Sequence, residues 1–200
     1  MVEALAIVGG YLLGSLPFGY WLPLVFRGED IRKTGSGNVG ASNVFRIYGK
    51  RLGIAVALLD LAKGFAAALL GLAAGGALIG VLAGAAAMVG HARPIFMGFR
   101  KGGKMVATAG GATFALAPLA ALCCVGIWLV MFVLTRYASV ASIVTALALV
   151  PAVLLFGHAW PVVVFAFACT AAIVFMHRQN IRRLFAGTEH RFELRRTRRA

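Results

Sequence analysis

Long apolar stretches without a charged residue dominate the sequence. Asp, Glu, Lys and Arg are absent from 64–90, 105–135 and 137–176, and 1–26 carries only Glu3. A helix that crosses a bilayer needs about 20 consecutive apolar residues. Each stretch is long enough for at least one such helix. The pattern therefore predicts an all-α, polytopic helical membrane protein.

Glycine and proline divide these stretches into shorter segments. Gly75 and Gly76 form one break, and Pro151, Gly157 and Pro161 bracket another, because both residue types interrupt regular helices. We therefore expect apolar helical segments near 3–26, 54–74, 76–92, 106–134, 138–156 and 158–176.

Basic residues lie between the apolar segments. The sequence has 20 Lys and Arg against 6 Asp and Glu. Loop 27–53 carries six basic residues, loop 93–104 carries four, and the region after His177 carries eight arginines. Since cytoplasmic loops are enriched in Lys and Arg, all three regions are expected in the cytoplasm. This orientation explains the positive charge without a nucleic-acid partner.

The number of crossings must agree with this orientation. Two segments separate loop 27–53 from loop 93–104, but three separate the second loop from the arginine-rich end. Segment 106–134 contains two adjacent glycines and Pro118 and has 29 residues, whereas two ordinary spans need about 40. We expect two short or partly re-entrant helices there. The count becomes about seven transmembrane helices, with the N-terminus out and the C-terminus in.

A single domain accounts for almost the whole chain. We expect one integral-membrane domain over 1–190 and a basic cytoplasmic tail over 191–200. The arginines of such a tail suit contact with anionic lipid headgroups, so bilayer lipids are expected partners.

The composition excludes several kinds of site. Apart from Glu29 and Asp30, the carboxylates are scattered and too few for two-metal chemistry. Cys123, Cys124 and Cys169 all lie in apolar runs, without the spacing of a zinc site or a disulfide framework. We expect no metal and no cofactor.

A glycine-rich polar stretch over 34–43 has the composition of an anion-binding loop. Successive N–H groups in such a loop form a concave nest for an anion. Ser36, Asn38 and Asn43 add neutral hydrogen-bonding groups, and Arg46 follows closely. The stretch suits a phosphate; the alternative is a flexible cytoplasmic linker.

A second glycine-rich stretch, 98–108, nearly matches a nucleotide-binding P-loop. Gly98, Gly103 and Lys104 have the required spacing, but Met105 replaces the necessary Ser or Thr and no strand precedes the loop. We reject nucleotide binding. Glycines and three basic side chains still suit a phosphate group, or an anchor at the level of the lipid headgroups.

Charged and hydroxyl side chains also lie in or beside the spans. Asp60 and Lys63 are three residues apart and should pair on one helix face, either facing a cavity or as a purely structural ion pair. Arg136, Ser139 and Ser142 reach the cytoplasmic face if 106–134 doubles back. The alternative for the serines is helix packing.

Two histidines end predicted spans on the cytoplasmic side. His91 precedes the second basic loop, and His177 stands three residues before Asn180. Each suits a general base, a hydrogen-bond donor or a plain interfacial side chain. Together these features predict a cytoplasm-facing site for phosphorylated ligands, with apolar walls that suit an acyl chain.

Several motifs, in this order, resemble those of the bacterial acyl-phosphate:glycerol-3-phosphate acyltransferase family (PlsY). The resemblance runs from about residue 5 to Glu189. The motifs are Gly14-Ser15-Leu-Pro17-Phe-Gly19, Gly35-Ser-Gly-Asn-Val-Gly-Ala-Ser-Asn43, Asp60-x-x-Lys63-Gly64, Gly90-His91-x-x-Pro94-x-Phe96, Gly102-Gly-Lys104, Val106-Ala-Thr108, Arg136-Tyr-x-Ser139-x-x-Ser142 and His177-x-x-Asn180-Ile-x-Arg183.

The resemblance implies a membrane enzyme of the first step of phospholipid synthesis. Such an enzyme transfers a fatty acyl group from acyl phosphate to the 1-hydroxyl of glycerol 3-phosphate. The products are 1-acylglycerol 3-phosphate (lysophosphatidic acid) and phosphate. It further implies a location in the bacterial plasma (inner) membrane, with the site facing the cytoplasm, no cofactor and no obligate protein partner.

Candidate site residues follow from these motifs as a mechanistic hypothesis. The catalytic candidates are Ser36, Asn38 and His91, with a substrate phosphate as the alternative proton acceptor to His91. Asp60 and Lys63 are expected to form a structural ion pair. The substrate-binding candidates are Gly35, Gly37, Gly40, Asn43, Arg46, Lys63, Gly102, Gly103, Lys104, Thr108, Arg136, Ser139, Ser142, His177 and Asn180.

The second loop departs from the family pattern. One residue is added after Phe99, and Met105 stands where the family has glycine. A membrane transporter for a small phosphorylated anion is the alternative function, because basic loops and a re-entrant segment suit one as well. Acyltransferases with a His-x4-Asp motif are excluded, since no histidine here has an Asp five positions on.

Overall fold

The computed structural model describes residues 1–192, and their regular structure is entirely helical, which confirms the predicted all-α fold. Most of the predicted tail, 193–200, lies outside the described residues. The described helices are α1 (Val2–Gly14), α2 (Phe18–Arg27), α3 (Ala41–Tyr48), α4 (Lys50–Ala92), α5 (Val106–Leu116), α6 (Pro118–Thr135), α7 (Ala138–Leu155), α8 (Trp160–Met176) and α9 (Arg178–Phe185), with short 3-10 helices η1 (Ile31–Lys33) and η2 (Ile95–Met97).

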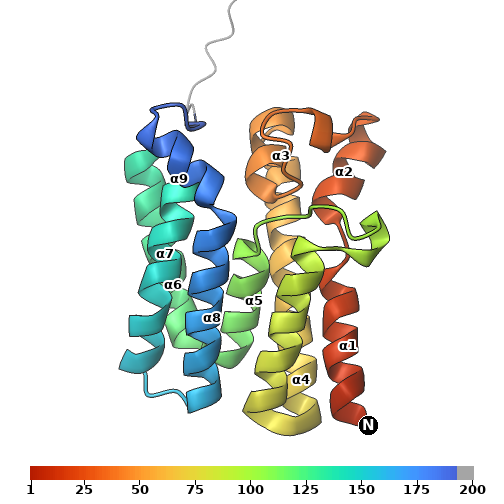
Figure 1. Ribbon diagram of the computed structural model, residues 1–200, viewed down its shortest axis with the longest axis vertical. Helices are drawn as coiled ribbons and strands as arrows, with labels where there is room; N and C mark the ends of the chain where they lie inside the picture. Colours follow the sequence, from red (N-terminus) through yellow and green to blue (C-terminus); the bar gives the residue numbers. More distant parts are fainter. Residues whose placement is uncertain (193–200) are drawn as a thin grey trace, which may run out of the picture.

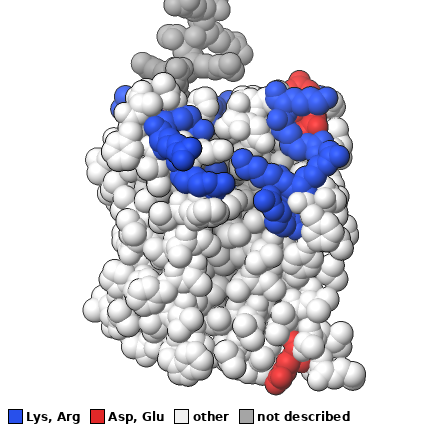
Figure 2. Space-filling view, in the orientation of Figure 1, with Lys and Arg blue, Asp and Glu red and all other residues white. Residues whose placement is uncertain are grey.

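The long helices stand side by side, and the polar loops lie together at one end of the molecule (Figure 1). α1 and α5 each pack against α4 on one side, and α6 and α8 each pack against α7 on the other. Lys and Arg gather at the end that carries the loops (Figure 2). The N-terminus lies at the opposite end. The side of the membrane that each end faces stays a prediction.

Several helices are long and apolar enough to cross a membrane. α8 and α9, bent by 53° at their junction, add one more span if they count as a pair. The predicted total of about seven crossings stays a prediction. By length and composition, the four candidate spans are Val2–Arg27, Lys50–Met97, Pro118–Thr135 and Ala138–Leu155.

α4 is two helices joined at a sharp break. Gly75 and Gly76 have non-helical torsions, with φ of −169° and 70°, and the chain turns back there (Figure 1). A side chain at Gly71 would overlap the backbone of Ile79 and Gly80, so the two halves are in direct backbone contact. The break predicted at the glycine pair is confirmed. Small residues permit this close approach.

Segment 106–134 also forms two helices, as the crossing count predicted. α5 has 11 residues and ends at Leu116, and Pro118 begins the 18-residue α6. At about 1.5 Å per residue, α5 spans only about half of a hydrocarbon core roughly 30 Å thick. A side chain at Gly111 of α5 would overlap the backbone of α4 at Leu61, so α5 packs tightly on its neighbour.

The first apolar segment, expected as one helix over 3–26, is broken. α1 ends at Gly14 and α2 begins at Phe18, because Pro17 has no N–H to continue the helical ladder. The carbonyl of Leu16 accepts a hydrogen bond from Lys63 Nζ at 2.9 Å. A backbone group freed at membrane depth needs such a partner, which Lys63 supplies.

The region after His177 begins with a helix that the sequence pattern did not reveal. α9 covers Arg178–Phe185, and only Asn180 in it is buried. Its bend relative to α8 carries Asn180 and Arg183 to the loop end of the molecule, beside the cavity described below.

Candidate active site

A cavity of about 530 Å³ lies between the two sides of the bundle, next to the polar loops. This volume is typical of small-molecule sites. Ser139, Ser142, Ala146 and Leu149 of α7 all line it, so it follows that helix for about 15 Å. The loop end is polar and the remainder is apolar. The apolar walls include Phe114, Trp128, Leu149 and Ile173.

Asn43, near the start of α3, holds the first glycine-rich loop in place. Its side-chain oxygen accepts a hydrogen bond from the Ser36 N–H at 3.0 Å. Its amide donates to the carbonyls of Thr34 at 3.1 Å and Asn38 at 3.0 Å. Asn38 Oδ1 accepts from the Gly40 N–H at 2.8 Å. Asn43 thus uses its side chain to shape the loop, and Ser36 and Asn38 face the cavity.

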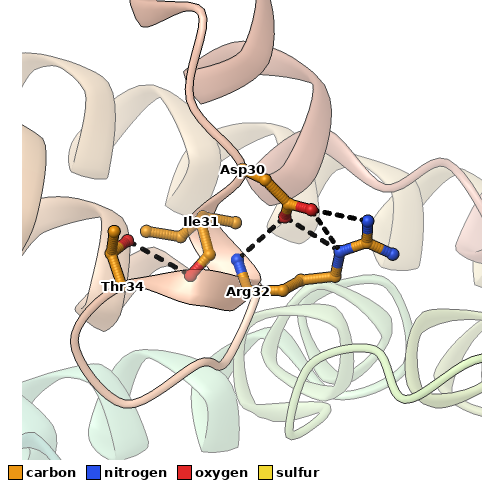
Figure 3. A network of polar contacts seen from close by, with 4 residues as sticks. All are labelled: Asp30, Ile31, Arg32 and Thr34. Carbon is orange, nitrogen blue, oxygen red and sulfur yellow. Dashed lines mark hydrogen bonds and ion pairs between the residues drawn. The ribbon is translucent and has the colours of Figure 1, made fainter.

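A compact turn anchors the chain just before this loop (Figure 3). Asp30 accepts hydrogen bonds from the Arg32 N–H at 3.0 Å and from Arg32 Nε at 2.9 Å. The hydrogen-bonded Arg32 guanidinium lowers the pKa of Asp30 to about 2. Thr34 Oγ1 donates to the Ile31 carbonyl at 3.3 Å, and Ile31 itself is buried. The loop therefore starts from a fixed point.

The second glycine-rich loop packs directly on His91. The N–H groups of Gly102 and Gly103 donate to the carbonyls of Ala92 at 2.9 Å and His91 at 3.0 Å. A side chain at Gly103 would overlap the imidazole of His91, so only glycine fits. Asn38 Nδ2 donates to the Gly102 carbonyl at 3.5 Å, a long bond that joins the two loops.

Met105 adopts a backbone conformation that few residues with a side chain adopt. Its φ is 69°, in the left-handed region that favours glycine. The strain of a side chain there is about 1–2 kcal/mol. The Met105 side chain packs against the buried apolar cluster around α5, which offsets part of that strain.

Lys104 begins a polar network at the mouth of the cavity. Its ammonium donates to Asn180 Oδ1, and Asn180 Nδ2 donates to Glu189 at 2.6 Å. Glu189 also accepts from Ser139 Oγ at 2.8 Å and Arg183 Nε at 2.7 Å. These hydrogen bonds keep the pKa of Glu189 below its usual value despite its burial. Burial lowers the pKa of Lys104 to about 8.

Arg46 of α3 faces the same region with an unused donor. Its Nε is buried and has no hydrogen-bond partner. Within residues 1–192, no carboxylate forms an ion pair with it. Burial lowers the pKa of the Arg46 guanidinium, partly against the attraction of Glu189. A half-buried guanidinium with a buried, unpartnered Nε favours a bound anion.

Asp60, Lys63 and His91 form a buried cluster under the loops. Lys63 Nζ lies 2.8 Å from Asp60 Oδ1, so the predicted ion pair is present. His91 Nδ1 lies 3.5 Å from the same oxygen. Asp60 and His91 line the cavity, whereas Lys63 points toward the Leu16 carbonyl instead.

Two further side chains make local bonds at the cavity wall. Ser142 Oγ donates to the Ala138 carbonyl at 2.7 Å and accepts from Trp128 Nε1 at 3.2 Å. His177 Nδ1 lies 2.8 Å from the Ile173 carbonyl, which leaves its other ring nitrogen for the cavity side.

The structure brings most of the predicted site residues together. The predicted residues that line the cavity are Ser36, Asn38, Gly40, Asn43, Arg46, Asp60, His91, Lys104, Ser139, Ser142, His177 and Asn180. Those that lie outside its lining are Gly35, Gly37, Lys63, Gly102, Gly103, Thr108 and Arg136. Thr108 is fully buried where α5 meets α4, against Gly64.

Among the cavity-wall residues that sequence reasoning missed, Glu189 and Phe192 matter most for the polar end. Glu189 had one available signal, as one of only two carboxylates in the arginine-rich region after His177. Phe192 had none, since it falls in the segment interpreted as tail. Among residues 1–192, no group of His, Cys, Asp and Glu side chains is arranged to hold a metal ion.

Comparisons with known proteins agree with this geometry. Residues 4–187 match the model of the family described as glycerol-3-phosphate acyltransferase. A glycerol-3-phosphate acyltransferase of Synechococcus sp. (strain JA-2-3B'a(2-13)) is 44% identical over 191 residues, covering 96% of this chain and 95% of the relative. Glycerol-3-phosphate acyltransferase 2 of Moorella thermoacetica is 46% identical over 187 residues, covering 94% and 96%.

A solved structure has the same fold. The glycerol 3-phosphate form of PlsY, an integral membrane glycerol 3-phosphate acyltransferase, matches with a TM-score of 0.92 at 40% identity, over 96% of both chains. Its lysophosphatidic acid form matches with a TM-score of 0.89 at 39% identity. The resemblance stated from the motifs is confirmed. This chain is an integral membrane protein that belongs to the glycerol-3-phosphate acyltransferase family.

Proposed function

We propose that this chain transfers a fatty acyl group from acyl phosphate to the 1-hydroxyl of glycerol 3-phosphate. The products are lysophosphatidic acid and phosphate. Glycerol-3-phosphate acyltransferase activity follows from the family. The observation that carries the proposal is a cavity with the half-buried cations Arg46 and Lys104 at its polar end and apolar walls beyond. Such a cavity fits phosphate groups and an acyl chain at the same time.

The two substrates divide the cavity between them. Arg46, Lys104 and Asn180 supply cationic and amide groups for glycerol 3-phosphate, with Ser142 and His177 beside them. The first glycine-rich loop, with Ser36 and Asn38, supplies donors for the acyl phosphate. The acyl chain follows the apolar wall along α7. Donors fixed in advance stabilise the charge that develops on the carbonyl oxygen.

The reaction needs no covalent enzyme intermediate, because acyl phosphate is already activated. The glycerol 1-hydroxyl oxygen attacks the acyl carbonyl carbon, and the bond from that carbon to the phosphate oxygen breaks. Phosphate leaves with the electron pair. Binding both substrates with the reacting atoms about 3–3.5 Å apart supplies much of the acceleration.

The hydroxyl proton has two possible acceptors. One is His91, which lines the cavity with Nδ1 3.5 Å from Asp60. The other is a phosphate oxygen of the substrate. Packing of the imidazole against Gly103 restricts access to His91 and supports the second route. A general base contributes about 10²–10⁴-fold, so a drop of that size in His91→Gln supports His91, and a near-normal rate supports the phosphate.

The location follows from the charge pattern. The active site lies at the end of the molecule where Lys and Arg gather (Figure 2). Positively charged ends of membrane proteins face the cytoplasm. The proposal therefore includes a single membrane domain over 1–190 in a bacterial inner membrane, with the site facing the cytoplasm and bilayer lipids as its surroundings.

The test uses the purified full-length protein in lipid or detergent. Palmitoyl phosphate and glycerol 3-phosphate are mixed in EDTA, and phosphate and lysophosphatidic acid are followed over time. A parallel sample contains acyl-CoA instead. Product from acyl phosphate alone supports the proposal. Product from acyl-CoA alone contradicts the proposed donor.

The transporter alternative has its own measurement. Protein reconstituted in liposomes is tested for uptake of labelled glycerol 3-phosphate without any acyl donor. Uptake without acyl transfer by the same preparation would overturn the enzymatic proposal. Acyl transfer without uptake removes the alternative.

A further inference from the structure

Phe192 lies beyond the residues that the family model covers, yet it belongs to the cavity wall. The family match ends at residue 187. The Phe192 side chain is only 8% exposed and lines the cavity. We propose that Phe192 is a positioning residue that holds the Arg46 guanidinium at the polar end of the cavity and so sets the affinity for glycerol 3-phosphate. This inference rests on the proposed function.

Backbone and side chain both fix Phe192. Its N–H donates to the carbonyl of Arg136, at the end of α6, at 2.9 Å. Its ring packs edge-to-face against Phe132 of α6 and Phe45 of α3, with centroids 5.1 and 5.5 Å apart. Aromatic pairs favour this geometry and distance. The ring is therefore held from two directions.

The ring connects two parts of the molecule that pack mainly on other helices. α3 packs on α4 and α2, whereas α6 packs on α7 and α5. α3 and α9 stand on opposite sides of the loop end, and the described chain ends near α9 (Figure 1). Phe192 reaches from there to α3, because it contacts Phe45.

Arg46 rests on the face of this ring. Its guanidinium carbon lies 4.7 Å from the Phe192 ring centroid. Arg46 Nε is buried without a hydrogen-bond partner. Stacking uses the flat face of a guanidinium, whereas the N–H groups point outward in its plane. The same guanidinium can therefore stack on Phe192 and donate to phosphate oxygens.

Restricting Arg46 before the ligand arrives favours binding. A free arginine side chain has many rotamers, and ordering it on binding weakens affinity. Phe192 restricts those rotamers in advance through an attractive cation–π contact. Arg46 is assigned to glycerol 3-phosphate and not to acyl phosphate. Loss of the Phe192 contact should therefore alter the KM for glycerol 3-phosphate and leave the KM for acyl phosphate unchanged.

The test compares Phe192→Leu with Phe192→Tyr in the full-length protein. Leucine keeps an apolar side chain but has no aromatic face, whereas tyrosine keeps the face. We expect Phe192→Leu to raise the KM for glycerol 3-phosphate by about 3- to 10-fold, the range of a partly buried cation–π contact. The kcat and the KM for palmitoyl phosphate should stay within about twofold, and Phe192→Tyr should retain the wild-type KM.

Two controls separate positioning from packing. Phe185→Leu removes an aromatic ring from a side chain that is 90% exposed and should change nothing. In an Arg46→Lys background, Phe192→Leu should add little to the KM, because the shared partner is already altered. Thermal unfolding of each variant reports folding separately.

The outcomes are distinct. A Phe192→Leu enzyme with wild-type KM for glycerol 3-phosphate overturns the inference, as does an equal rise in both KM values. An additive effect in the Arg46→Lys background also overturns it. If wild-type protein shows no acyl transfer at all, the proposed function fails first.

Discussion

The charge of Lys104 is set by burial. Burial lowers the pKa of Lys104 to about 8, with repulsion from Arg183, Lys101 and Arg46 acting in the same direction and attraction to Glu189 opposing it. A lysine with a lowered pKa loses its charge as the pH rises through that value. A phosphate ligand is then held less tightly, because the ammonium no longer attracts it.

We expect kcat/KM for glycerol 3-phosphate to fall above pH of about 8, approaching tenfold per unit, in a profile from pH 6.5 to 10. Lys104→Arg, whose guanidinium stays charged, should remove the decline in this range even if its overall rate is lower. A wild-type profile that stays flat to pH 10 contradicts the role given to the ammonium.

Met105 combines backbone strain with side-chain packing. Its φ of 69° disfavours any side chain, while its own side chain packs on the cluster around α5. Met105→Ala removes the packing and keeps the strain. Met105→Gly removes both. We therefore expect the alanine variant to be less stable than the glycine variant by about 1 kcal/mol, measured by denaturant or thermal unfolding in detergent.

Equal stability of the two variants, or a more stable alanine variant, would contradict the inference that a side chain at position 105 strains the backbone. Glycine is the reference in this comparison because it adopts φ of 69° without a clash.

At the scale of elements, Glu189 joins α7 to α9. It accepts hydrogen bonds from Ser139 on α7 and from Asn180 and Arg183 on α9. These bonds lower its pKa in the folded protein. A carboxylate with a lowered folded pKa stabilises the fold above its unfolded pKa, and that stability is lost as the pH falls through the folded value.

We expect Glu189→Gln to lower the stability at pH 7 by about 2 kcal/mol, since hydrogen bonds to a charged group are replaced by bonds to a neutral one. The wild type should lose more stability than the variant as the pH is lowered below 4.5, the usual value for this group. Thermal unfolding at a series of pH values measures both effects. Parallel pH dependence of the two proteins would contradict the argument.

The elements that sequence predicted share a local signal. Apolar length, the pair Gly75 and Gly76, and Pro118 after two glycines all report on neighbouring residues. The break at Pro17 lies inside an unbroken apolar run, and the Leu16 carbonyl beside it bonds to Lys63, 47 residues away. A hydropathy pattern carries no information about a contact between residues so far apart in the sequence. The chain can bend there only because a distant side chain satisfies the backbone.

The site residues also divide into those with a local sequence signal and those that depend on long-range contacts. Glycine-rich loops and basic residues indicated Ser36, Asn38, Arg46 and Lys104 as site candidates, and all four line the cavity. Glu189 and Phe192 escaped notice because a charged helix of only eight residues, α9, returns the chain to the cavity. Eight residues give too few repeats for a hydrophobic pattern to be recognised.

At the scale of the whole molecule, the two ends differ in charge and in chain segments. Lys and Arg gather at the loop end, and the N-terminus and the turn between α7 and α8 lie at the other (Figures 1 and 2). Because positive loops stay in the cytoplasm, the orientation of every helix follows from this one asymmetry.

The orientation is tested with single cysteines in a background where Cys123, Cys124 and Cys169 are replaced by alanine. Ala159→Cys lies exposed in the turn between α7 and α8, and Lys50→Cys lies exposed at the loop end. In intact bacterial cells, a membrane-impermeant thiol reagent should label Ala159→Cys at once. It should label Lys50→Cys only after the membrane is opened, because the basic loops face the cytoplasm.

The reverse labelling pattern would place the active site outside the cell. It would contradict the orientation inferred from the clustering of Lys and Arg. Labelling of both positions in intact cells would mean that α7 does not run the full thickness of the membrane between the two ends. α7 has 18 residues, about 27 Å of helix, which nearly matches a hydrocarbon core of roughly 30 Å. If α7 crosses the membrane fully, the two cysteines must therefore differ in their labelling in intact cells.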